Sequence, residues 1–279
     1  MSAERVEGRF AGAAGGQISW QGWVPGGDLT GAVVLVHGLA EHGGRYAHVA
    51  ARLAEDGYAT YAADHRGHGK SDGVKGNLHR MSTVVTDLET MIRSVAQRHP
   101  GVPMFLYGHS MGGLVALVYA TGPRPAELRG MVLTSSALDI GVNSAAERLG
   151  ARVLSAVAPN AGTVRLDGST LSHDPEVVRD YDTDPLNYRG KTRARTAGEM
   201  LAAIASVRAK LGTLTLPLLV LHGTEDRLTF PAGSKLIAER AGSADVTLKL
   251  YDGWYHELHN EPEQATVLDE IVRWLKEHG

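Results

Sequence analysis

Two serines in the chain lie in the pattern Gly-x-Ser-x-Gly, which presents a serine hydroxyl as a nucleophile at a sharp turn between a strand and a helix. Ser110 follows an apolar, strand-like run at 104–107 and precedes a helix-like run at 112–120. Ser71 lies instead in a glycine-rich loop at 65–76, with no helix-like run after it. We therefore expect Ser110 to be the nucleophile and Ser71 to be a residue of a surface loop.

A serine hydroxyl attacks a carbonyl carbon only when a base accepts its proton, and the base needs a partner that holds its tautomer. In the fold that uses this turn, the chain order is serine, acid, histidine. Asp226 follows the strand-like run 218–221, and His256 follows the run 246–250. Both loops should open at the edge of the sheet where Ser110 lies, which predicts a catalytic triad of Ser110, Asp226 and His256.

Other residues compete for two of these roles. Glu225 and Asp139 are further candidates for the acid, because each lies after a predicted strand. His259 competes with His256 for the role of base, and the chain holds 13 histidines in all. Two histidines at this spacing could also bind a metal, but a metal site needs further ligands and no His-Glu-x-x-His pattern occurs. We therefore expect no metal.

Backbone N–H groups should stabilise the oxyanion that forms when the serine attacks. One donor is expected from Met111, the residue directly after the nucleophile. The second is expected from Leu39, in the loop after the strand-like run 32–36, where Gly38 allows the bend. Two such donors would lower the barrier by several kcal/mol.

Strand-like and helix-like segments alternate along most of the chain, and they must position these residues. The predicted strands are 32–36, 59–63, 104–107, 131–133, 218–221 and 246–250. The predicted helices are 45–56, 84–98, 112–120, 231–240 and 262–276, after a leading antiparallel hairpin of 7–11 and 17–23. Short, almost continuously apolar strands separated by helices are typical of a parallel sheet that is covered on both faces. Together with the serine turn and the order serine, acid, histidine, these segments predict an α/β-hydrolase fold with a mostly parallel, eight-stranded sheet.

The alternation breaks once, between 137 and 215, where no clean strand occurs. We interpret 137–215 as a helical cap inserted into a core of 1–136 and 216–279. Such an insertion would lie over the carboxyl edge of the sheet, where ligands bind in open α/β folds. Its apolar residues Leu149, Val153, Leu154 and Val157 could form a wall for an apolar substrate, or could simply dock the cap on the core.

Composition excludes several functions. A net charge of −3 gives no field that would recruit nucleic acid. The absence of cysteine excludes disulfides, thiolate metal sites and a cysteine nucleophile. Residues 1–5 lack the start of a secretory signal, and the longest apolar run is too short to span a membrane. We expect a cytoplasmic protein.

Several motifs together resemble those of the monoacylglycerol lipases, with the closest similarity to bacterial, actinobacterial-type members. They are 37–42 with Arg45-Tyr46, 64–71, 108–112, 182–186, 223–227 and 255–261, and they span nearly the whole chain. The first of them and the cap motif 182–186 are the most specific. The chain has Leu39 where a small residue is often found after His-Gly, which leaves the chemistry intact but puts the shape of the pocket in doubt.

The resemblance implies hydrolysis of monoacylglycerols to glycerol and free fatty acid, without a cofactor. Ser110, Asp226 and His256 match the triad of the family, and Leu39 and Met111 match its oxyanion donors. Four further positions match residues that form or support the polar pocket for the glycerol head group: Glu41, Arg45, Tyr181 and His259.

Other functions use the same triad or the same scaffold. A broader carboxylesterase or a lysophospholipase remains an alternative, and so does a catalytically silent binding module. A peptidase is disfavoured, because the cap carries no obvious acidic cluster for a substrate amino terminus. A mobile cap helix with exposed apolar residues could also bind peripherally to a lipid surface. We keep that contact as a hypothesis.

Overall fold

The computed structural model describes residues 3–122, 128–142 and 144–279. Met1 and Ser2, on which the expectation about a secretory signal partly rests, lie outside the described residues, as do 123–127 and 143. The strands are β1 (Glu4–Ala11), β2 (Gln17–Val24), β3 (Gly31–Val36), β4 (Tyr58–Ala63), β5 (Met104–His109), β6 (Gly130–Thr134), β7 (Leu218–Gly223) and β8 (Val246–Tyr251). The α-helices are α1 (Ala47–Glu55), α2 (Met81–Arg98), α3 (Met111–Ala120), α4 (Ala145–Val157), α5 (Pro175–Thr183), α6 (Ala194–Lys210), α7 (Pro231–Arg240) and α8 (Gln264–Glu277).

All eight strands form one sheet in the order β1-β2-β4-β3-β5-β6-β7-β8. Strands β3 to β8 pair in parallel, whereas β2 pairs antiparallel with both β1 and β4. The predicted α/β-hydrolase sheet and its leading hairpin are therefore confirmed. Because the parallel strands share one direction, the residues that follow β3, β5, β6, β7 and β8 all meet at a single edge.

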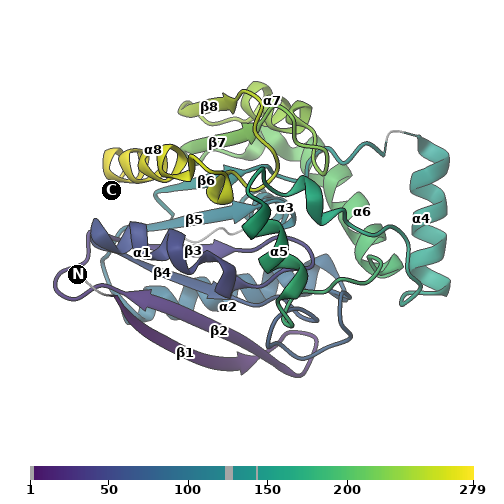
Figure 1. Ribbon diagram of the computed structural model, residues 1–279, viewed down its shortest axis with the longest axis horizontal. Helices are drawn as coiled ribbons and strands as arrows, with labels where there is room; N and C mark the ends of the chain where they lie inside the picture. Colours follow the sequence, from purple (N-terminus) through teal and green to yellow (C-terminus); the bar gives the residue numbers. More distant parts are fainter. Residues whose placement is uncertain (1–2, 123–127, 143) are drawn as a thin grey trace.

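Helices cover both faces of the sheet (Figure 1). Side chains alternate along each strand, so neighbouring residues such as Val33 and Val34 enter different cores. One core packs the sheet against α2, α3, α6 and α7, and the other packs it against α1 and α8. This burial on both faces is why the strands appeared as almost uninterrupted apolar runs.

In the described residues, the segment between β6 and β7 consists of helices and loops, with one isolated bridge between Gly162 and Arg193. Figure 1 shows α4 at one end of the molecule, with α6 between it and the rest of the fold. The buried residues of α6, among them Met200 and Val207, belong to the core that also contains α2, α3 and α7. The predicted cap at 137–215 thus ends in a helix that also supports the sheet. Its boundaries remain a prediction.

No helix in the described ranges is both long and apolar enough to cross a lipid bilayer.

Candidate active site

Ser110 lies at the turn between β5 and α3, where its backbone has φ 53° and ψ −120°. A Cβ atom added at Gly112 would lie 1.9 Å from the carbonyl oxygen of Val36, and one at Gly108 would lie 2.7 Å from Cα of Gly113. Helix and strands therefore approach so closely that only glycine fits on either side of the serine. This strained turn is the one that the sequence pattern around Ser110 predicted.

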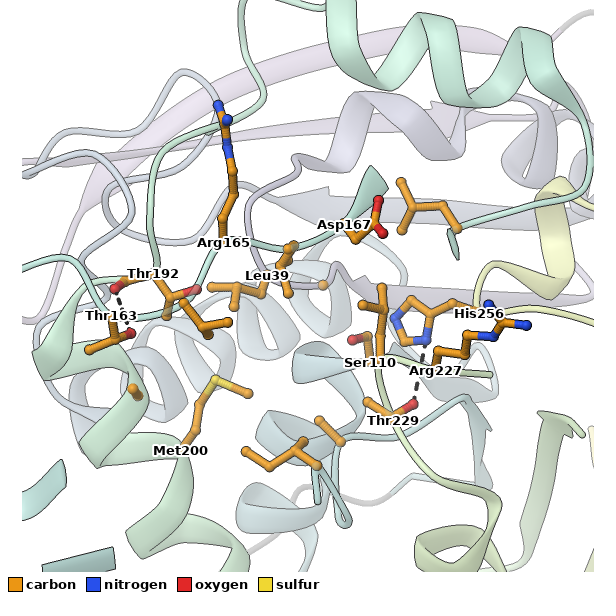
Figure 2. A pocket seen from close by; sticks show the side chains of 18 of the residues that line it. Leu39, Ser110, Thr163, Arg165, Asp167, Thr192, Met200, Arg227, Thr229 and His256 are labelled. Carbon is orange, nitrogen blue, oxygen red and sulfur yellow. Dashed lines mark hydrogen bonds between the residues drawn. The ribbon is translucent and has the colours of Figure 1, made fainter. Parts of the chain in front are cut away.

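His256 and Asp226 are hydrogen-bonded at the same edge of the sheet. Nδ1 of His256 lies 2.7 Å from Oδ2 of Asp226, and both side chains are buried. A carboxylate only accepts, so Nδ1 carries the proton and Nε2 is left unprotonated. Ser110 and His256 border the same cavity, and Figure 2 shows them at the same end of it. The structure thus brings together the three residues predicted as the triad.

Asp226 has more partners than His256 alone. Oδ1 accepts hydrogen bonds from the amides of Leu228 (2.8 Å) and Thr229 (3.0 Å), and the Thr229 hydroxyl lies 2.9 Å from Oδ2. His222 Nε2 lies 3.1 Å from the carbonyl oxygen of Thr229 and 3.2 Å from Oδ2 of Asp226. Because that carbonyl can only accept, the hydrogen on Nε2 of His222 is directed to Thr229, and the ring lies beside the carboxylate. Neither His222 nor Thr229 was predicted as a site residue.

The pKa values of Asp226 and His256 shift in opposite directions. Burial alone would raise the pKa of Asp226, but His256 and His222 outweigh it and hold that pKa below its usual range. Burial would lower the pKa of His256, but the carboxylates of Asp226, Glu257 and Glu41 together raise it above the ordinary value. His256 therefore binds a proton more readily than a free histidine would.

The competing residues lie elsewhere. Glu225 is exposed, and Asp139 pairs with Arg208 at 3.4 Å. His259 is fully buried and stacks on Tyr46, with ring centroids 4.7 Å apart.

The expectation that Ser71 lies on the surface was wrong. It lies in the predicted loop but is buried there rather than on the surface, because its hydroxyl donates to Asp64 O (2.7 Å) and accepts from Ser19 N (2.9 Å).

The predicted oxyanion donors lie next to Ser110 in the fold. Leu39 borders the cavity in the turn after β3, and Met111 is the first residue of α3, where helix amides lack partners within the helix. A Cβ atom added at Gly38 would lie 3.2 Å from Cβ of Ser110, so the turn reaches the nucleophile. Their role as donors remains a prediction.

A charged cluster borders the site. Arg45 donates to Glu41 Oε2 (2.6 Å) and to both carboxylate oxygens of Glu257 (2.6 and 2.8 Å), while its guanidinium lies 5.1 Å from the centre of the Tyr181 ring. Glu41, Tyr181 and Glu257 border the cavity. His259 does not, but it packs on Tyr46, whose hydroxyl donates to Glu41 (2.7 Å). Glu257 was not predicted, although it directly follows His256.

The cavity itself has a volume of about 530 Å³. Away from the charged cluster it is mainly apolar, and most of that lining comes from the segment after β6. The apolar residues include Ile140, Val142, Ala151, Leu171, Met200 and Leu201. The cavity is therefore lined by a buried polar cluster and by many apolar side chains, and Glu41 of the cluster lies near Ser110, since a Cβ atom added at Gly38 would approach both.

A serine at a strained strand–helix turn beside a buried histidine–aspartate pair, on this sheet, defines a serine hydrolase of the α/β-hydrolase fold. The family profile described as serine aminopeptidase, S33 (Hydrolase_4) matches residues 27–263. The chain is 43% identical to the monoacylglycerol lipase of Mycolicibacterium smegmatis, over 100% of this chain and 99% of the relative. It is 37% identical to the monoglyceride lipase of Homo sapiens, over 91% of this chain and 85% of that one.

A solved structure agrees with these relatives. The crystal structure of Paleococcus ferrophilus monoacylglycerol lipase matches with a TM-score of 0.83 and 30% identity, and the match covers 100% of both chains. The chain therefore belongs to the monoacylglycerol lipase family, within the Hydrolase_4 group. The resemblance that the sequence motifs indicated is confirmed.

Proposed function

We propose that the protein hydrolyses monoacylglycerols to glycerol and a fatty acid, through an acyl-enzyme formed on Ser110. The observation that carries this proposal is the position of Ser110 between an apolar chamber and a buried polar cluster. An ester of a long acyl chain with a small polyol has one apolar and one polar half, joined at the scissile bond. The names of the relatives support the same substrate.

In the first step Oγ of Ser110 attacks the ester carbonyl carbon while Nε2 of His256 takes its proton. Asp226, hydrogen-bonded to Nδ1 at 2.7 Å, keeps the imidazole in the required tautomer and stabilises the imidazolium that forms. The amides of Leu39 and Met111 stabilise the oxyanion, and a single donor of this kind contributes about 3 kcal/mol. Collapse of the intermediate expels glycerol, which takes its proton from His256.

In the second step water attacks the acyl-enzyme, with His256 again as the base. The carbonyl–Oγ bond breaks, Ser110 recovers its proton from His256, and the fatty acid leaves. No cofactor takes part in either step.

The polar cluster would take up the glycerol hydroxyls. Glu41 and Tyr181 border the cavity and offer a carboxylate and a phenol, and Arg45 fixes both from behind. Burial, assisted by Glu41, raises the pKa of Tyr181 to about 12, so its hydroxyl stays protonated and can donate. His259 supports the cluster through Tyr46.

We also propose that helix α4 binds peripherally to the lipid surface that supplies the substrate. Leu149, Val153 and Val157 are spaced by four residues and form one stripe, and their exposed fractions are 63%, 52% and 75%. The same helix borders the cavity through Glu147 and Ala151. The stripe lies on the face of α4 opposite to these two residues, so it points outward and could contact a lipid surface next to the cavity.

A hydrolysis panel on purified protein tests the substrate. Rates are compared for a monoacylglycerol, a diacylglycerol, a lysophospholipid, a short aryl ester and an amino-acid anilide, the last because the family description names an aminopeptidase. We expect the monoacylglycerol to be preferred and Ser110→Ala to lose at least about a thousandfold in rate. A fluorophosphonate probe should label Ser110 alone. Preference for the lysophospholipid or the anilide would contradict the proposal.

A further inference from the structure

Glu257 has no part in the mechanism described above, yet its carboxylate is one of the most firmly held in the protein. Both of its oxygens accept hydrogen bonds from Arg45, at 2.6 and 2.8 Å, and Oε2 also accepts from the Asn260 side-chain amide at 2.7 Å. The residue is 1% exposed and borders the cavity directly after His256 in the chain. Its carboxylate therefore belongs to the polar cluster that borders the cavity.

Arg45 alone cannot balance the charges at this end of the cavity. One guanidinium lies between two carboxylates, because Arg45 also donates to Glu41 at 2.6 Å. The Gly38 amide (2.5 Å) and the Tyr46 hydroxyl (2.7 Å) complete the donors around Glu41, as expected for an ionised acceptor. Glu41 and Glu257 border the cavity, whereas Arg45 lies behind them.

The pKa shifts agree with an ionised Glu257. Burial would raise its pKa, but Arg45 outweighs burial and holds the pKa well below its usual range. Burial also raises the pKa of Glu41, and Arg45 opposes that rise. Of the two carboxylates, Glu257 is thus the more firmly ionised.

The cations that also border the cavity lie on its exposed rim. Nε of Arg165 donates to the carbonyl oxygen of Arg189 at 2.7 Å, and in Figure 2 its guanidinium points away from Ser110. Arg227 is exposed, and its guanidinium lies 5.8 Å from the centre of the Tyr255 ring. The rim also carries the acidic Asp167 and Glu147. Solvent screens these charges, whereas the buried carboxylates are screened little.

We propose that Glu257 is a specificity-determining residue, which together with Glu41 forms a two-carboxylate wall that admits neutral polyol head groups and excludes anionic, phosphorylated ones. The inference rests on the proposed function, because it assigns the alcohol half of the substrate to this end. Ionised carboxylates can accept hydrogen bonds from glycerol hydroxyls. They repel a phosphate monoester, which offers mainly acceptors and negative charge.

The test compares two esters of the same acyl chain, 1-lauroylglycerol and 1-lauroylglycerol 3-phosphate, both below their aggregation thresholds. We expect kcat/KM of the wild-type protein to favour the neutral ester by at least about a hundredfold, and Glu257→Gln to reduce this ratio about tenfold or more. Glu225→Gln removes the same charge from an exposed neighbour of Asp226 and should leave the ratio unchanged. Glu257→Asp, which keeps the charge, should preserve most of the preference.

The rate on p-nitrophenyl butyrate at pH 8 reports the triad independently of glycerol. If Glu257→Gln retains that rate and its ratio stays within twofold of wild type, the inference is overturned. If the wild-type protein cleaves the aryl ester but not 1-lauroylglycerol, the proposed function fails. In that case, or if Glu257→Gln does not fold, a second experiment tests the inference. The butyryl-enzyme of the wild-type protein is allowed to transfer its acyl group to an added alcohol in competition with water. Glycerol should accept the acyl group and glycerol 3-phosphate should not, and equal capture overturns the inference.

Discussion

Asp226 is bonded more heavily than the orientation of one histidine requires. Two backbone amides, a threonine hydroxyl and the imidazole of His222 surround its carboxylate in addition to His256. Those partners fix the carboxylate before substrate arrives, so His256 is held in one orientation with its Nε2 free. They also allow Asp226→Asn to fold, because most of the hydrogen bonds can be kept.

Asp226→Asn tests this arrangement. The amide would favour the wrong tautomer of His256, and we expect kcat to fall by about four orders of magnitude. The protein should still fold but lose some thermal stability, because the lowered pKa of Asp226 means that its ionised form stabilises the folded state. Glu225→Gln should keep full activity, since Glu225 is exposed. A rate on the aryl ester within tenfold of wild type would show that Asp226 does not orient the base.

The pH dependence of the rate follows from His256. The imidazole must be neutral to accept the proton of Ser110, and its pKa is raised above the ordinary value of 6.5. Activity on a dissolved aryl ester should therefore fall as the pH drops, with its midpoint above 6.5. Glu257→Gln should move that midpoint to lower pH, because Glu257 contributes to the raised pKa. A rate that is constant between pH 5 and 8 would contradict the assignment of His256 as base.

At the residue scale, the meeting of Asp226 and His256 at the edge of the sheet that carries Ser110 could be predicted, because the three residues follow strands in the expected chain order. His222, Thr229 and Glu257 could not. His222 belongs to a buried strand and resembles an ordinary core histidine in the sequence. The role of Glu257 depends on Arg45, which is 212 residues away in the chain. Nothing in the pattern of either segment indicates that the two side chains meet.

At the scale of elements, the turn between β5 and α3 depends on close approach. Gly112→Ala would force Cβ to within 1.9 Å of a backbone oxygen of β3, which cannot move without displacing the sheet. We expect a loss of about 3 kcal/mol in the free energy of unfolding, together with loss of activity. Gly150→Ala in helix α4 is the matched control, because an added Cβ there meets no atom within 4 Å other than the backbone of its own helix turn.

Urea unfolding of the two variants measures both effects. Gly150→Ala should gain about 0.5–1 kcal/mol, since alanine replaces glycine inside an exposed helix. Equal stability of the two variants would mean that β3 and α3 are not packed as described.

The exposed apolar stripe on α4 leads to a second prediction at the scale of elements. Replacing Leu149, Val153 and Val157 together by serine should weaken sedimentation with phosphatidylcholine vesicles at least about tenfold. The rate on a dissolved aryl ester should stay the same, because these side chains are exposed and are not part of either core. Val74→Ser is a control for an equally exposed valine elsewhere, at 50%. Unchanged vesicle binding of the triple variant would exclude α4 as the contact.

Most elements were predictable because burial on both faces leaves a strong apolar signal. Differences arose where that signal is weak. Strand β1 starts at Glu4, three residues earlier than predicted, because it is an edge strand of alternating exposed residues. The helix predicted at 45–56 starts as a 3₁₀ turn, Gly43–Tyr46, since the His42 side chain accepts the Gly44 amide and caps it. Helix α6 belongs to the predicted cap and also packs against the sheet. The hydrophobic periodicity of its sequence does not reveal this, because the packing depends on the path of the chain in three dimensions.

For the whole molecule, buried histidines set the response to acid. Burial is the first cause that lowers the pKa of five of them, His37, His65, His68, His109 and His259. The unfolded chain binds protons below about pH 6.5 at these sites, and the folded chain does not. Stability should therefore be lost as the pH falls from 6.5 towards 4, by up to about 1.4 kcal/mol per pH unit for each group.

Urea midpoints between pH 7.5 and 5 measure this loss. His256, whose pKa is raised, has the opposite sign, but it is one group against five. Asp226 and Glu257, whose pKa values are lowered, add to the loss only below their unfolded values, near pH 4. A urea midpoint that is independent of pH over this range would mean that the five histidines are not buried in neutral form.

Two parts of the predicted cap are held by different contacts. The Tyr188 amide donates to Ala40 O (2.8 Å) and Asp184 pairs with His42 (2.8 Å), which fastens the second half of the cap to the turn beside the nucleophile. Helix α4 packs instead on α6, and the two helices approach closely where Gly198 of α6 faces Ser155 of α4. On the proposed function, substitutions in α4 would change part of the chamber for the acyl chain and leave the proposed glycerol pocket in place. Diversity among such enzymes should accumulate on α4 first.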